Sequence, residues 1–167
     1  HLEQELGRKV ILATDADYLA HYRAVHDGSY DLMVTGPHFG ASGIASGAFL
    51  PLFRYDAELR PILVVRKGSG ITGPESLRGR RVALSSRLSV SSIGGLRWLT
   101  ESGLVADEDY SIVASPSHTT AMMSVALGDV DAALTTYTPL HQLTEDIRDQ
   151  LDVLPSPQAS PHLFTMV

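Results

Sequence analysis

Short apolar runs alternate with amphipathic stretches along the chain, and only a few polar residues or a glycine separate most of them. Residues 9–13 (KVILA) and 30–35 (YDLMVT) have the composition of strands. Between them, residues 18–26 place their apolar side chains on one face of a helix, and a second helix of small residues is predicted over 41–48. This β-α-β-α rhythm with short connections indicates a parallel, doubly wound sheet.

The rest of the chain continues in the same way. Further strands are predicted over residues 49–54, 59–66, 81–84, 110–114, 130–135, 151–154 and 163–167. Further helices are predicted over residues 72–79 (one turn), from the serines near 91 to 102, over 119–127 and over 139–150. Ile93, Leu96, Leu99 and Trp98 are expected on the inner face of the second of these helices.

Residues 81–135 thus form a second β-α-β-α-β unit like the first. We therefore expect an α/β fold of two doubly wound lobes, joined at residues 59–66 and 130–136 as a two-strand hinge. The expected division is residues 1–62 and 137–167 for lobe 1 and residues 63–136 for lobe 2.

A serine-rich turn at residues 85–92 joins a buried strand to the helix that follows it. Ser91 or Ser92 is a natural N-cap for that helix, because its hydroxyl accepts an amide proton that has no partner in the helix. The remaining amides and the positive end of the helix dipole form an anion site, to which the hydroxyls add donors. The alternative is that these serines only cap the helix.

Composition and charge exclude several classes of function. The 167 residues include 13 basic and 19 acidic side chains, a net charge of -6, and only 7% aromatics, so nucleic acid is not an expected partner. No apolar run approaches the about 18 residues of a membrane span, so no membrane insertion is expected. The absence of cysteine excludes disulfides, thiolate metal sites and cysteine nucleophiles. Residues 1–7 look like the end of a helix closed by Gly7, so we expect residues before them, including any targeting segment.

The sequence offers little for an enzyme. Ser89 or Ser91 with His118 has the residue types of a triad, but no Gly-x-Ser-x-Gly turn surrounds either serine. His21 and His26 are five residues apart and fall on different faces of a helix, which disfavours a zinc pair. Phosphate-binding and dinucleotide-binding glycine motifs are absent. We therefore expect a protein that is not an enzyme and has no metal or cofactor.

Several motifs together resemble a known family along nearly the whole chain. They are Ala16-Asp17-Tyr18, Gly28-Ser29-Tyr30-Asp31-Leu32 followed by Gly36-Pro37, residues 64–71 (VVRKGSGI), residues 77–83 (LRGRRVA), the serine turn, Ser117-His118 and residues 126–133 (ALGDVDAA). This set is similar to the phosphate/phosphonate-type substrate-binding proteins of ABC importers, which have the type II periplasmic-binding-protein fold. The family's first strand and first helix are mostly missing here, which implies a gap in the sheet of lobe 1.

The resemblance implies a binding site for a small oxyanion. The positions that match the family's ligand contacts are Tyr18, Phe39, Ser89, Val90, Ser91, Ser92 and His118. Val90 stands where the family has threonine and Ser92 where it has glycine. One donor is therefore lost, which costs about 1 kcal/mol unless Ser92 or Arg87 compensates or the ligand has fewer acceptors. His118 titrates near neutral pH, so it would make anion affinity pH-dependent.

The resemblance also implies a role and a place in the cell. We expect an extracytoplasmic solute-binding protein, lipid-anchored in a Gram-positive organism, that captures phosphate, phosphite or a phosphonate-like anion between its lobes and delivers it to an ABC transporter permease. Two alternatives share the fold: the ligand-sensing domain of a receptor such as a sensor kinase, and the effector domain of a transcription regulator. Residues beyond this segment would distinguish them, through a signal peptide or lipobox, a transmembrane segment or a helix-turn-helix.

Overall fold

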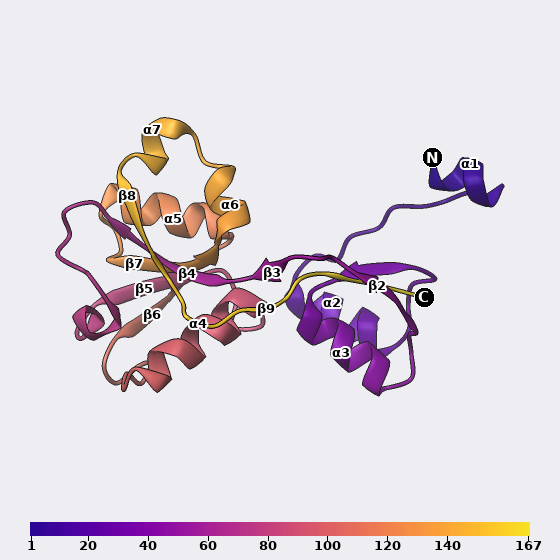
Figure 1. Ribbon diagram of the computed structural model, residues 1–167, viewed down its shortest axis with the longest axis horizontal. Coiled ribbons are helices and arrows are strands. Elements are labelled where there is room, and N and C mark those ends of the chain that lie inside the picture. The colour runs from indigo at the N-terminus through magenta and orange to yellow at the C-terminus, as the bar shows by residue number, and fades with distance from the viewer.

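A computed structural model describes residues 1–167, and it places them in two lobes that lie side by side (Figure 1). Lobe 1 contains α1 (Leu2–Leu6), α2 (Tyr18–His26), β1 (Met33–Thr35), α3 (Pro37–Ala45), β2 (Pro51–Arg54) and β10 (Phe164–Met166). Lobe 2 contains β4 (Pro61–Arg66), the 3-10 turn η1 (Pro74–Leu77), β5 (Arg81–Leu84), α4 (Val90–Glu101), β6 (Ser111–Ala114), α5 (His118–Leu127), β7 (Ala132–Thr136), α6 (Tyr137–His141), α7 (Glu145–Arg148) and β8 (Leu151–Pro155). Strands β3 (Glu58–Leu59) and β9 (Ser160–Pro161) lie between the lobes.

Lobe 2 is a three-layer structure around a five-stranded sheet in the order β6-β5-β7-β4-β8. The central strand β4 is buried on both faces. Ile62 and Val64 lie in the apolar cluster that also contains residues of α5 and α6, and Leu63 and Val65 lie in the cluster on the other face, which contains residues of α4. A strand covered by helices on both sides needs apolar residues at every position, which explains the continuous run that the sequence shows there. β5 runs parallel to β6 and β7, so the helices after β5 and β6 begin at the same edge of the sheet.

Lobe 1 is smaller and has a three-stranded antiparallel sheet in the order β1-β10-β2. Its core consists of side chains that α2 and α3 and the strands contribute, and Val25, Phe39 and Met166 are at most 4% exposed. α3 packs closely on the core because Gly43 lies where a Cβ atom would be 3.0 Å from Val25. The two helices hold their N-terminal ends toward lobe 2 (Figure 1).

The chain crosses between the lobes twice, through β3 and β9, which pair with each other in antiparallel fashion. Arg60 strengthens this crossing, since its guanidinium donates to the carbonyls of Ser156 and Pro157. Residues 137–155, which the sequence analysis assigns to lobe 1, pack against the five-stranded sheet instead, because Leu140, Leu143 and Leu151 belong to its core. We propose that the lobe boundaries lie at β3 and β9.

Several local predictions differ from the structure. The sheet of lobe 1 is antiparallel instead of parallel, the helix predicted over 41–48 is α3, which begins at Pro37, and the strand predicted over 59–66 is divided into β3 and β4. Residues 9–13 form no strand: β1 pairs only with β10, and without a partner the segment leaves Ile11 75% and Leu12 93% exposed. The helix predicted over 139–150 is two short helices, α6 and α7, because the chain turns between them and buries Leu143. Ile93 is 45% exposed, whereas Leu99 on the same helix is fully buried.

Most other elements lie within a few residues of their predicted positions, and α2 and β5 have the predicted bounds. No helix is both long and apolar enough to cross a membrane.

Candidate functional site

The serine turn lies at the edge of lobe 2 where β5 ends and α4 begins. Ser89, not Ser91 or Ser92, is the N-cap of α4: its backbone is extended and its hydroxyl accepts the amide of Ser92 at 3.2 Å. The cap lies earlier than predicted because the helix starts at Val90, so both later serines belong to its first turn. The amides of Val90 and Ser91 have no hydrogen-bond partner within the chain, as is usual for the first residues of a helix.

The three serine hydroxyls form one buried cluster. Ser89 Oγ lies 3.0 Å from Ser91 Oγ and 2.8 Å from Ser92 Oγ, and all three residues are at most 2% exposed. A hydroxyl carries one proton, so Ser89 cannot donate to every oxygen around it, and its neighbours supply the other donors. The turn therefore concentrates three hydroxyls and two amides at the positive end of a 12-residue helix.

The start of α5 lies at the same edge of the sheet. Ser117 caps this helix by accepting the amide of Thr120 at 3.0 Å, and His118 is its first residue. Parallel strands β5 and β6 place the N-termini of α4 and α5 next to each other, at the carboxyl ends of the strands, where ligands of open α/β sheets bind. Ser85 links the two, because its Oγ lies 3.2 Å from Nε2 of His118.

Burial governs the charge of His118. It lowers the pKa of His118 below the usual 6.5, and a hydrogen bond to the backbone of Leu134 opposes this shift. The imidazole is therefore neutral at pH 7 in the protein as it stands. An anion beside it would favour the protonated form.

Lobe 1 meets this edge with two side chains from its helix N-termini. Tyr18, the first residue of α2, faces Ser85: burial raises the pKa of the Tyr18 phenol, and the Ser85 hydroxyl opposes that rise. His38, on the first turn of α3, places Nε2 2.7 Å from the carbonyl oxygen of Leu88. Residues 85–89 of lobe 2 are thus contacted by lobe 1 near both ends, by Tyr18 at Ser85 and by His38 at Leu88.

The structure places five of the seven expected residues in two groups along residues 85–92. Tyr18 and His118 lie at Ser85, where this segment begins, and Ser89, Ser91 and Ser92 form the cluster where it ends. Val90 is half-buried on the first turn of α4, whereas Phe39 is 4% exposed and belongs to the core of lobe 1. Phe39 stacks on His38 with ring centroids 3.9 Å apart, so it supports the site from behind.

Arg87, expected to compensate for the lost donor at Val90, pairs instead with Asp107 at 2.7 Å on the exposed side of the turn. Ser85 and His38 were not identified from the sequence. Their positions carried a signal: Ser85 ends a parallel strand, and His38 follows Gly36-Pro37 at a helix start, the two places where such folds bind ligands.

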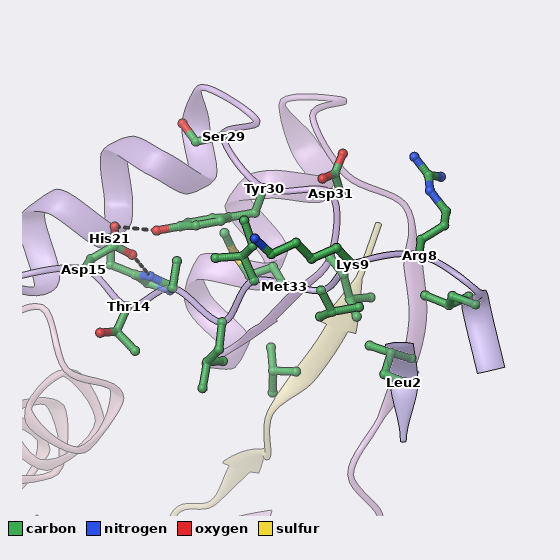
Figure 2. Close-up of a pocket in the computed structure, with 17 residues that line it drawn as sticks. Leu2, Arg8, Lys9, Thr14, Asp15, His21, Ser29, Tyr30, Asp31 and Met33 are labelled. Carbon is green, nitrogen blue, oxygen red and sulfur yellow. Dashed lines mark hydrogen bonds and ion pairs between the residues drawn. The ribbon is translucent and has the colours of Figure 1, made fainter. Parts of the chain in front are cut away.

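A second polar cluster lies deeper in lobe 1. Asp15 accepts a hydrogen bond from Tyr30 at 2.8 Å and lies 2.7 Å from Nδ1 of His21, whose Nε2 lies 2.6 Å from the hydroxyl of Thr35. The hydrogen bond from His21 is the main cause of the lowered pKa of Asp15. Figure 2 shows this cluster at one end of a hollow of about 730 Å³ between residues 8–15 and β1, away from the serine turn.

Two lobes on a pair of crossing strands, with helix N-termini of both lobes directed at one loop, define a two-lobed solute-binding protein of the type II periplasmic-binding-protein fold. The chain belongs to the family described as ABC transporter, phosphonate, periplasmic substrate-binding protein, whose family model matches residues 1–167.

Solved structures of low sequence identity share this fold. The chain is 18% identical to PhnD1 from Prochlorococcus marinus in complex with methylphosphonate, with a TM-score of 0.79. The match covers 99% of this chain and 66% of PhnD1. It is 16% identical to a binding protein component of an ABC phosphonate transporter from Pseudomonas aeruginosa, with a TM-score of 0.79. That match covers 99% of this chain and 59% of the Pseudomonas protein. A histidine kinase sensor domain with similarity to periplasmic binding proteins is 20% identical, with a TM-score of 0.67, covering 99% of this chain and 68% of that one. The chain therefore spans about 59–68% of the length of these proteins.

Proposed function

We propose that this protein captures a small oxyanion, such as phosphate, phosphite or a phosphonate, between its two lobes and delivers it to an ABC importer outside the cytoplasm. The observation that carries the proposal is the pairing of two helix N-termini at one edge of lobe 2. The unpartnered amides of Val90 and Ser91 and the three serine hydroxyls provide donors without a formal positive charge.

His118 and Tyr18 complete the proposed site from opposite lobes. Both reach Ser85, so a ligand at the serine turn would contact groups from each lobe. A ligand that bridges two lobes stabilises the closed arrangement, because only that arrangement offers all its contacts. We infer that Ser89, Ser91, Ser92 and the amide of Val90 hold the anion, and that Phe39 acts by supporting His38.

Isothermal titration calorimetry with phosphate, phosphite, methylphosphonate and sulfate tests this proposal. We expect at least one of them to bind with a dissociation constant below millimolar, and Ser91→Ala to weaken that binding. Ser111→Ala, at the exposed start of β6, is the matched control and should bind as the wild type does. The absence of binding of all four anions at millimolar concentration would contradict the proposal.

The similarity to a histidine kinase sensor domain favours a second candidate, in which the same site reports the anion to a signalling domain. The two candidates share their ligand chemistry and differ in what adjoins this segment. The complete gene distinguishes them. A signal peptide favours the importer, and a lipobox favours an importer whose binding protein is lipid-anchored. A transmembrane segment leading to a kinase favours the sensor.

A further inference from the structure

His38 makes a hydrogen bond between the lobes through the backbone of the loop that leads into the serine turn. Its Nε2 lies 2.7 Å from the carbonyl oxygen of Leu88, the residue before the N-cap of α4. A carbonyl only accepts, so Nε2 carries the proton. In the neutral ring, Nδ1 is then unprotonated.

The environment of Nδ1 disfavours a second proton. This atom is buried without a hydrogen-bond partner, and it lies over Gly36, where a Cβ atom would be 3.3 Å away. Protonation of the ring would place an N–H at Nδ1 with no acceptor. The ring also packs against Phe39, with ring centroids 3.9 Å apart and planes tilted by 37°.

The titratable groups around His38 belong to both lobes. On the lobe 1 side they are Tyr18 and His21, the latter bonded to Asp15. On the lobe 2 side, Arg87 is next to Leu88 and pairs with Asp107, and His118 lies behind Ser85. Burial is the largest cause of the lowered pKa of His38, and a charge on His21 lowers it further, whereas the bond to Leu88 raises it.

We propose that His38 is a pH-sensitive clasp, whose neutral imidazole holds the serine turn against lobe 1 and whose protonation releases it. The inference rests on the proposed function, since it names what regulates closure around the anion. When the lobes separate, His38 is exposed to water and regains an ordinary imidazole pKa. Closure is therefore fully favoured above pH 6.5, the usual pKa, and is progressively lost as the pH falls below it.

The test compares the wild type with His38→Gln and His38→Leu in the full-length protein. Glutamine retains an N–H donor for the Leu88 carbonyl but does not titrate, and leucine retains bulk without a donor. The dissociation constant of methylphosphonate is measured for each protein from about pH 5.5 to about pH 8. At each pH, the dissociation constant of the variant is divided by that of the wild type, so that titration of the ligand and of His118 cancels. The wild type should lose up to about tenfold in affinity relative to His38→Gln between pH 8 and pH 5.5. His38→Leu should bind more weakly than His38→Gln at pH 8.

A ratio of wild type to His38→Gln that does not change with pH, or His38→Leu binding as tightly as the wild type, would overturn the clasp. A ¹⁵N NMR titration of the imidazole, with and without saturating methylphosphonate, tests the same claim on the ring itself. We expect the Nε2–H tautomer and a pKa below 6.5 in the saturated protein, where the lobes are in contact. A normal pKa with a mixture of tautomers in the saturated protein would refute the clasp even though the anion binds, whereas the expected spectrum in a protein that binds none of the anions would refute only the proposed function.

Discussion

Ser85 Oγ lies 3.2 Å from Nε2 of His118, and the same hydroxyl faces the phenol of Tyr18 from the other lobe. One side chain at the end of β5 therefore positions two groups that we propose contact the ligand.

Replacing Ser85 with alanine should weaken oxyanion binding. The change removes the hydroxyl that lies at His118 and faces Tyr18, at a cost of about 1 kcal/mol, which corresponds to roughly a fivefold rise in the dissociation constant. Calorimetry with the tightest anion measures this change. Ser111→Ala is the control, because the Ser111 hydroxyl makes only a long, exposed bond to Arg80. Equal affinity of Ser85→Ala and wild type would show that Ser85 does not position the site.

Val90→Thr should strengthen binding. Val90 is the first residue of α4 and half-buried beside the serine cluster, and threonine adds one hydroxyl with little change in shape. If that hydroxyl reaches the ligand, the gain is about 1 kcal/mol, or roughly fivefold in affinity. Val105→Thr, on a side chain that is 46% exposed, is the matched control and should leave affinity unchanged. A Val90→Thr variant that binds more weakly, or no better, would mean that the first turn of α4 does not face the anion.

Asp15→Asn should destabilise lobe 1. The carboxylate has bonds to both His21 and Tyr30, so its loss costs about 1–3 kcal/mol in the free energy of unfolding, whereas Tyr30→Phe removes only one neutral donor and costs less. Chemical denaturation at pH 7 measures both. The folded-state pKa of Asp15 is below the usual 3.8, so its contribution is complete above pH 3.8 and is lost as the pH falls below it. A difference between wild type and Asp15→Asn that persists well below that pH would contradict this assignment.

The position of α4 over the sheet depends on Gly95. A Cβ atom there would be 2.7 Å from Cδ2 of Leu134, which is fully buried in β7. Gly95→Ala gains about 1 kcal/mol in helix propensity, but overpacking costs about 1–3 kcal/mol. We expect a net loss of stability of up to about 2 kcal/mol, with weaker anion binding because the serine turn moves with the helix. Ile93→Ala, on the exposed face of α4, should change stability by less than about 0.5 kcal/mol. A fully stable Gly95→Ala variant would show that α4 has room to move.

The sequence predicted lobe 2 more closely than lobe 1, for a physical reason. In lobe 2 each strand and helix has its partners, so local pattern and tertiary packing agree, as for β5 and α5. Residues 9–13 have a strand pattern, but β1 bonds only to β10 and no ladder stabilises them. The break between α6 and α7 was equally hidden, because Leu140, Leu143 and Ile147 have a helical spacing and all pack on the same core, although two short helices carry them.

The site was predictable in part. The serine turn, His118 and Tyr18 stand out through helix-capping chemistry and the family motifs. Ser85 and His38 do not, since their roles come from contacts between lobes, and the His38–Leu88 bond joins positions 50 residues apart. Phe39 has the residue type of a ligand contact but is buried beneath His38 in the core of lobe 1.

A crystal structure of the protein with methylphosphonate tests the central claim most directly. The account predicts phosphonate oxygens within hydrogen-bond distance of the amides of Val90 and Ser91 and of the serine hydroxyls, with Tyr18 and His118 in contact from opposite lobes. A phosphonate bound elsewhere, or an occupied site in which the first turn of α4 makes no contact with it, would contradict the account.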